Sequence, residues 1–147
     1  MNYRLTFPIE PYPRRLQAKV VRLGRSSVAK IHLHKKSDNH QKTTIQLACI
    51  QWKKPPLTGP LTVHIVFIFA RPQKTKHEKH IVFPDCDNLL KNLWDALTKA
   101  GVWTDDSQVW SVCAQKRYCE GVDTPRTEII IETENASVLP FLDRRKS

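Results

Sequence analysis

The segment from Asp85 to Val109 constrains the fold most, because it reads as one amphipathic helix between two acidic pairs. Its apolar residues recur at helical spacing and form one stripe, made of Leu89, Leu90, Leu93, Trp94 and Leu97. The stripe predicts a helix from about Asn88 to Ala100, with Asp87 as its N-cap and Gly101 as its terminator. The other positions, Lys91, Asn92, Asp95 and Lys99, are expected on its polar side.

Strands are predicted before and after this helix. Residues 61–70, LTVHIVFIFA, form the clearest strand, which is expected in the centre of the sheet. Residues 3–9, 109–118 and 127–134 are also expected to be strands, and residues 19–24 and 28–34 a basic hairpin. The combination indicates an α+β fold, with a small mixed or antiparallel sheet packed against helices.

The segment from Ser37 or Asp38 to about Lys53 leaves two interpretations open. Apolar residues at helical spacing favour a helix, whereas an alternating subset also fits a strand; the first set is Ile45, Ala48, Cys49 and Trp52, and the second Ile45, Leu47 and Cys49. Pro55-Pro56 ends the segment in either case.

The length of 147 residues fits a single domain. Residues 1–60 are expected to form a basic N-terminal part, residues 61–134 the core, and residues 135–147 a tail. In the tail, the segment 138–142 has the apolar character of a docking segment, but an untethered or self-packed end is preferred.

The charge is distributed unevenly. Residues 1–54 hold 12 Lys and Arg against only Glu10 and Asp38, so this part alone accounts for the net charge of +10. Such an excess indicates a polyanionic partner, with nucleic acid favoured over a membrane surface. The alternative is a solvated basic face without a specific partner.

Four carboxylates flank the predicted helix: Asp85, Asp87, Asp105 and Asp106. Helix capping explains Asp87, and a polar turn explains one of the later pair, but neither requires Asp85. If the four converged, they would repel one another, and a divalent cation such as Mg²⁺ would relieve that conflict. A basic surface that holds a polyanion beside a metal site that attacks it is therefore predicted.

Cationic residues near this site have both a functional and an ordinary interpretation. Lys91 follows Asp87 by four residues, so it can neutralise a scissile phosphate or form a surface ion pair with Asp87 or Asp95. Residues 71–80, RPQKTKHEKH, are expected to be a loop that either contacts phosphate or is a solvated connector. The candidate DNA-contacting residues are Arg71, Lys74, Lys76, Lys79 and, on a later strand, Lys116.

The remaining features bear on the compartment. The N-terminus lacks a signal-peptide core, and no apolar run is long enough to span a bilayer, which predicts a cytoplasmic, nucleoid-associated protein without membrane contact. Reduced thiols are then expected. A zinc site that uses Cys113, Cys119, His77 and His80 is disfavoured, because their spacing fits no standard ligand pattern.

The stretch DCDNLLKNLWDALTKAGVWTDDSQV, from Asp85 to Val109, resembles the signature of the RusA-type Holliday junction resolvases. The family pattern falls without a gap on Asp85, Asp87, Asn88 and Lys91, on 95–97, on Gly101 and on 105–109. A weaker similarity continues to Lys116 and to residues 126–131, for a coverage of about residues 61–134. The N-terminal part lacks the family's Pro-Pro-Ser-x-Asn element, and the residues up to Pro56 do not align by eye.

The resemblance implies a RusA-like α+β homodimer that nicks four-way DNA junctions with Mg²⁺, for which Mn²⁺ can substitute. By that match, Asp85, Asp87 and Asp106 are catalytic metal-binding carboxylates, Asp105 is an adjacent acid at the metal, and Lys91 is the essential basic residue. A two-fold dimer suits the approximate two-fold symmetry of a junction. Its interface is expected on one of the last strands or on the exposed face of the Leu89 helix.

Other functions remain open at the level of sequence. One is a DNA- or junction-binding protein without catalytic activity, although such a protein would not need carboxylates beside phosphate. Another is a nuclease that acts on flaps, forks or RNA. Nicking of a four-way junction with and without divalent ions separates the first alternative, and a comparison of substrates separates the second.

Overall fold

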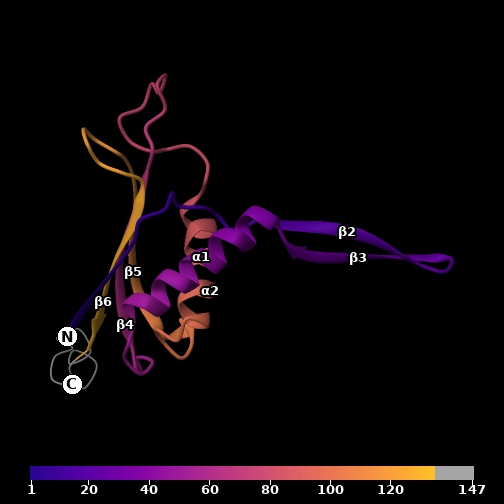
Figure 1. The fold of residues 1–147 in the computed structure, drawn as a ribbon, viewed down its shortest axis with the longest axis horizontal. Coiled ribbons are helices and arrows are strands. Elements are labelled where there is room, and N and C mark those ends of the chain that lie inside the picture. The colour runs from indigo at the N-terminus through magenta and orange to yellow at the C-terminus, as the bar shows by residue number, and fades with distance from the viewer. Residues whose placement is uncertain (135–147) are drawn as a thin grey trace, which may run out of the picture.

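The computed structural model describes residues 1–134. Figure 1 shows a sheet covered on one face by two helices, with a long hairpin projecting away from both. The sheet order is β1 (Asn2–Phe7), β6 (Arg126–Thr133), β4 (Leu61–Phe69) and β5 (Val109–Tyr118). β6 pairs antiparallel with β1 and β4, whereas β4 and β5 are parallel. The predicted α+β class and its mixed sheet are confirmed, and the tail segment 138–142 lies outside the described residues.

The core forms between the sheet and the helices. Strand β4 lies between β6 and β5, as predicted, and alternate residues from Leu61 to Phe69 are buried. They pack with Leu5 and Phe7 of β1 and with Ile129 and Ile131 of β6 in one hydrophobic cluster. The parallel pair β4–β5 requires a long crossover, and the chain uses this crossover to place the second helix across the sheet.

The first helix, α1 (Lys35–Gln51), settles the open choice in favour of a helix. It begins earlier than predicted, because the His34 side chain accepts a hydrogen bond from the Lys36 amide at the N-cap. Its buried face is largely polar, with Ser37, Gln41, Thr44 and Ala48 turned inward. This mixed face is the reason that hydrophobic spacing alone left the segment ambiguous.

The second helix, α2 (Cys86–Lys99), carries the predicted apolar stripe, and Leu89, Leu93 and Leu97 are buried. The expectation that Asn92 lies on the polar side was wrong, since only 2% of it is exposed. Its amide donates to the Tyr12 carbonyl oxygen at 3.0 Å and accepts from Gln41 at 3.3 Å. Asn92 therefore joins α2 to α1 and to the segment that follows β1.

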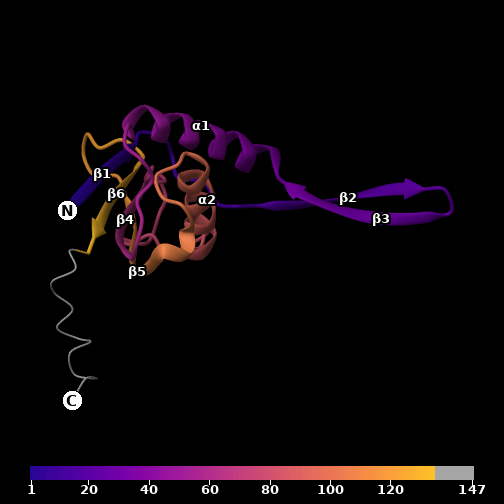
Figure 2. The ribbon, with the colours of Figure 1, turned by 90° about the horizontal axis from the view of Figure 1, so that it is seen from below.

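The predicted basic hairpin is confirmed and is longer than expected. It consists of β2 (Leu16–Leu23) and β3 (Ser26–Leu33), joined by Gly24 and Arg25. Gly24 has a positive φ of 62°, a conformation that glycine adopts without strain in two-residue hairpin turns. Figure 2 shows that this ribbon extends away from the sheet and helices. Among the described residues, no helix is long and apolar enough to cross a membrane.

Candidate active site

The N-terminus of α2 presents the first two candidate carboxylates. Asp85, not Asp87, occupies the N-cap position, with φ −72° and ψ 149°. The prediction of Asp87 as N-cap was wrong by two residues, and Asp87 lies in the first turn instead. In the described structure, the exposed carboxylate of Asp85 makes no capping hydrogen bond to α2. The carboxylate oxygens of Asp85 are therefore not used for capping, although Asp85 holds the N-cap position.

Lys91 lies one turn after Asp87 on the exposed side of α2. Its ammonium is 3.9 Å from the Asp87 carboxylate, and both side chains are more than half exposed. A pair of this length and exposure adds little to stability, because water screens the charges. Lys91 and Asp87 thus form a surface i,i+4 ion pair, and both side chains remain accessible to a ligand.

The later acidic pair is held by a short 3₁₀ helix, η1 (Asp106–Gln108). Asp105 is its N-cap and accepts a hydrogen bond from the Ser107 amide at 2.9 Å. Gln108 accepts in return from the Asp105 amide and donates to the carbonyl oxygens of Leu57 and Gly59. This reciprocal box fixes the turn that carries Asp106 against the segment that leads into β4.

The two acids of this pair differ in their surroundings. The Ser107 amide and a hydrogen bond with Asp106 lower the pKa of Asp105. Partial burial, that same bond with Asp105, and the negative charges of Asp105 and Asp95 raise the pKa of Asp106. Two neighbouring carboxyl groups with a third negative charge nearby form a site where a cation is favourable.

Asp95 is a charged neighbour of Asp106 that sequence reasoning did not include in the candidate site. It follows Asp87 by eight residues on α2, and its charge acts on Asp106 across the turn. Arg14 approaches it, with Nη1 at 3.8 Å from the Asp95 carboxylate. The spacing of Asp87, Lys91 and Asp95 at successive intervals of four residues was the available signal, because such positions share one side of a helix.

The structure therefore places the candidate carboxylates in two groups. Asp85 and Asp87 lie at the start of α2. Asp105 and Asp106 lie at the start of η1, where the negative charge of Asp95 raises the pKa of Asp106. Within residues 1–134, no three His, Cys, Asp or Glu side chains are close enough together to hold a metal ion. Cys113, Cys119, His77 and His80, the set considered for zinc, form no such group among the described residues either. The donor chemistry nevertheless fits a hard cation, because Mg²⁺ binds through one or two carboxylates and keeps several waters.

Lys116, a candidate DNA contact, is engaged with the backbone that precedes Asp85. Its ammonium donates to the carbonyl oxygens of Val82 and Pro84 at 2.8 and 2.9 Å. The Phe83–Pro84 peptide bond, just before the helix, is cis. Lys116 thereby links β5 to the loop that presents the Asp85 carboxylate.

The other candidate DNA contacts lie on the loop between β4 and α2, as predicted. Arg71, Lys79 and Lys116 line an open groove of about 540 Å³, whereas Lys74 and Lys76 are exposed outside its lining. Arg117 and Arg126 add positive charge to this groove, but four acids lie among them: Glu78, Glu120, Asp123 and Glu128. Its charge is therefore mixed, and the groove by itself does not define an anion site.

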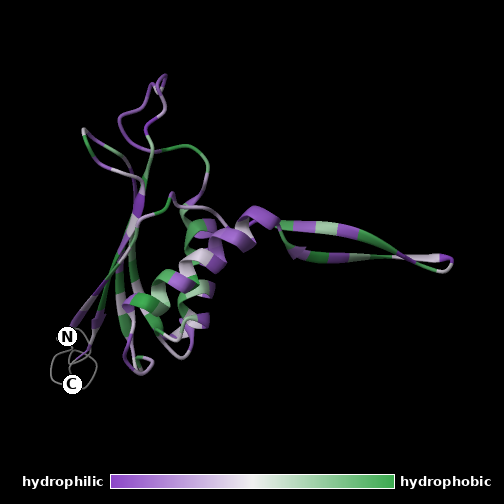
Figure 3. Ribbon diagram, viewed as in Figure 1, coloured by the Kyte–Doolittle hydropathy of each residue, from purple (hydrophilic) through white to green (hydrophobic). Residues whose placement is uncertain are grey.

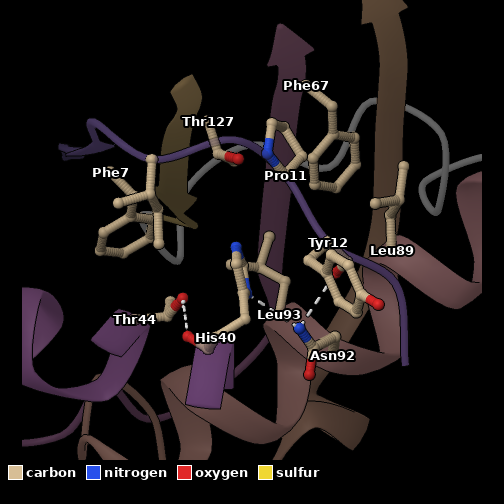
Figure 4. A pocket seen from close by; sticks show the side chains of 11 residues that line it. Phe7, Pro11, Tyr12, His40, Thr44, Phe67, Leu89, Asn92, Leu93 and Thr127 are labelled. Atoms are coloured by element: carbon tan, nitrogen blue, oxygen red, sulfur yellow. Dashed lines mark hydrogen bonds between the residues drawn. The ribbon is translucent and has the colours of Figure 1, made fainter. Parts of the chain in front are cut away.

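A small cavity lies behind the site, between α1, α2 and the segment after β1 (Figure 4). Its volume of about 10 Å³ accommodates about one water molecule. His40 and Asn92 meet at its wall, with a distance of 3.1 Å between His40 Nδ1 and Asn92 Nδ2. The cavity is too small for a substrate, so the candidate chemistry belongs to the exposed carboxylates.

Comparison with known proteins identifies the family. The model of the family described as "Endodeoxyribonuclease RusA" matches residues 8–132. The chain belongs to this family. The match to RusA also includes β2, β3 and α1, so the resemblance extends beyond residues 61–134 into the N-terminal part that could not be aligned by eye.

Similarity to a curated protein agrees with the family assignment. Over 58 residues the chain is 40% identical to a crossover junction endodeoxyribonuclease RusA of Lactococcus phage r1t. This similarity covers 39% of the chain and 44% of the relative, so the chain spans less than half of that relative's length. RusA membership is thus established over most of the chain, and the similarity to the phage protein over a part of it.

Proposed function

We propose that this chain is an endodeoxyribonuclease that cleaves four-way DNA junctions with a divalent cation, Mg²⁺ or, as a substitute, Mn²⁺. The observation that carries the proposal is Asp85. Its carboxylate stands at the N-cap of α2, makes no capping bond among the described residues, and lies two residues from the exposed Asp87. A helix start gains from acidic residues, but it does not need two of them exposed with free oxygen atoms.

Asp85, Asp87 and Asp106 would hold the cation, with Asp105 beside them. This requires the group at the start of α2 and the group at η1 to draw together around the ion, because no three of these side chains are close enough in the described structure. When bound, such an ion supplies Lewis acidity, which activates water for attack on phosphorus and neutralises phosphate charge. The reciprocal bonds of Asp105 and Gln108 fix the turn on which Asp106 lies, which supports a role for this turn in the site. Lys91 extends from the next turn of α2 and would balance the charge that develops on the scissile phosphate or the departing oxygen.

The test compares Asp85→Asn and Asp87→Asn with the parent on a labelled four-way junction, with Mg²⁺ and with EDTA. We expect both variants to lose cleavage and to retain junction binding. Asp38→Asn is the matched control, since Asp38 pairs with Lys42 on α1 and lies outside the proposed machinery. Equal loss of binding and cleavage in the two variants would argue against a catalytic role, and absence of nicking by the parent with any divalent ion would favour a non-catalytic junction binder.

The substrate class needs its own comparison. Cleavage of four-way junctions should exceed cleavage of flaps, forks, duplex, single strands and RNA, because the related phage protein is named for the crossover junction. A preference for one of the other substrates would retain the nuclease and replace the junction assignment.

We also propose a homodimer, for which β5 offers the interface. β5 is an edge strand of the described sheet, and an edge presents backbone donors and acceptors to a second strand. Trp110 and Val112 on this strand are 61% and 47% exposed. A two-fold pairing there would present two equivalent sites to a junction.

A further inference from the structure

The ribbon formed by β2 and β3 has no structural task in the described fold. Within residues 1–134 its strands form a separate two-stranded sheet, and almost all of its residues are exposed. A two-stranded hairpin is marginally stable in water by itself. A projection of this length therefore indicates a surface that acts on a partner.

The charge of the ribbon points to the chemistry of that partner. Residues 11–37 contain eight Lys and Arg and no Asp or Glu, and four of the eight lie in the ribbon itself: Lys19, Arg22, Arg25 and Lys30. The strand register places Lys19 directly opposite Lys30, and Gln17 directly opposite His32. Like charges facing each other across a strand pair are unfavourable unless an anion lies over them. We call these four residues the basic face.

The other side of the ribbon has a different composition. Leu16, Ala18 and Val20 face Leu33, Ile31 and Ala29 there, and this side is apolar. Figure 3 shows hydrophilic and hydrophobic residues alternating along the ribbon, as expected when successive side chains point to opposite sides. Lys19 and Lys30 consequently lie together on one side of the ribbon. By the same alternation Arg22 lies on the apolar side, near the tip, and Arg25 lies in the turn.

The root of the ribbon is fixed beside the candidate active site. The Arg14 amide donates to the Asn88 carbonyl oxygen, in the first turn of α2, at 2.9 Å. The Arg15 guanidinium stacks over the Phe83 ring at 4.6 Å, two residues before Asp85. The Arg15 amide also binds the buried Ser37 hydroxyl, which donates to the Pro13 carbonyl oxygen. The ribbon thus starts at the flank of the carboxylates.

We infer that the basic face of the β2–β3 ribbon docks along a DNA duplex next to the cleavage site and holds one arm of the substrate. This inference rests on the proposed function for the identity of the polyanion. Eight residues per strand extend about 26 Å, which matches roughly seven or eight base pairs of duplex. A two-stranded ribbon also has the width that the major groove of DNA admits.

The experiment measures binding of the full chain to a labelled four-way junction, in EDTA, over a series of NaCl concentrations. The ribbon variant is the double substitution Lys19→Gln/Lys30→Gln. The control is the double substitution Lys53→Gln/Lys54→Gln, which also removes two positive charges but lies just after the C-terminal end of α1. Each phosphate contact contributes about 0.9 to the slope of log affinity against log salt, so the ribbon variant should lower the slope by roughly two. Its affinity should fall about tenfold or more at low salt, with the control unchanged.

A ribbon variant with the slope and affinity of the control would overturn the inference. The inference would also be overturned if the ribbon variant loses affinity only because it no longer forms the oligomer of the parent, as measured by the molecular mass of each protein in solution. The ribbon would then be a contact between copies of the chain. A second variant, in which Asn-Gly replaces residues 18–31, should show the same loss of slope, and its circular dichroism spectrum verifies the fold. These readouts concern binding alone, so they remain valid if the parent proves not to cleave DNA.

Discussion

The Lys116 ammonium lies 2.9 Å from the carbonyl oxygen of Pro84, the residue directly before Asp85. With its second bond to Val82, it ties β5 to the turn that presents the first carboxylate. A hydrogen bond from a charged donor is worth about 1.5–3 kcal/mol. Lys116 therefore has the contacts of a positioning residue, in contrast to a direct phosphate contact.

Lys116→Met should consequently reduce the turnover number of cleavage by about tenfold, and leave junction affinity and its salt dependence close to those of the parent. Lys116→Arg should recover part of the rate. The neighbouring Arg117→Met is the control, because its side chain pairs only with exposed Gln115 among the described residues. A decrease in the salt slope of about one would instead identify Lys116 as a phosphate contact.

Substitutions of Asp105 and Asp106 should have different effects on stability and on cleavage. Asp105→Asn retains an oxygen for the Ser107 amide, so we expect a stable protein with much of its cleavage activity. Asp105→Ala loses the cap, so its free energy of unfolding should be lower than that of the parent. Asp106→Asn should abolish cleavage with little change in stability. Urea unfolding and junction cleavage, measured on all three variants, check these expectations.

An Asp105→Asn variant as inactive as Asp106→Asn would assign Asp105 to the metal as well. The reciprocal bonds of Gln108 provide a further comparison. Gln108→Ala removes the partners of Leu57 and Gly59, and should lower both stability and cleavage together.

The sequence predicted those elements whose residues carry the pattern locally. The alternation from Leu61 to Phe69 and the Leu stripe of α2 each bury an apolar face, so their periodicity suffices. The helix α1 remained ambiguous because Ser37, Gln41 and Thr44 form its buried face. Hydropathy does not register a buried polar face that is satisfied by hydrogen bonds.

The carboxylates show the same limit at the site. Residue types and the RusA signature selected Asp85, Asp87 and Asp106, but spacing could not say which residue caps α2. Asn92 was misplaced because its partners Gln41 and Tyr12 lie 51 and 80 residues away in the sequence. The proximity of Asp95 to Asp106 likewise arises only when η1 folds back toward α2.

His40 should make stability depend on pH. Burial lowers the pKa of His40, although its bond to the Glu10 carbonyl oxygen acts in the opposite direction. A donor bond from Nε2 to Glu10 leaves Nδ1 to accept from Asn92, which requires the neutral ring. The unfolded chain, with a histidine pKa of about 6.5, binds the proton more readily, so stability should fall as the pH drops below about 6.5.

The measurement is the free energy of unfolding in urea between about pH 7 and pH 5.5, where each group contributes at most about 1.4 kcal/mol per pH unit. His40→Gln should have a flatter profile than the parent. His32→Gln, on the exposed ribbon, should keep the parent profile. Identical slopes for the parent and His40→Gln would show that the pKa of His40 is the same in the folded and the unfolded chain, and would overturn the prediction.

The proposed dimer predicts a specific effect at β5. Trp110→Lys places a charge on the edge strand, where a pairing copy would have to desolvate it. Light scattering after size-exclusion chromatography should show a dimer for the parent and a monomer for this variant at the same concentration. Val122→Lys is the control, because Val122 is fully exposed on the loop between β5 and β6.

Cleavage then links this interface to function. A monomeric Trp110→Lys variant should still bind a duplex, since the carboxylates and the ribbon lie on the same chain. It should lose paired nicking of opposite strands, because the second site would be absent. A parent that is monomeric throughout the concentration range, or a Trp110→Lys variant that remains dimeric, would place the interface elsewhere or remove it.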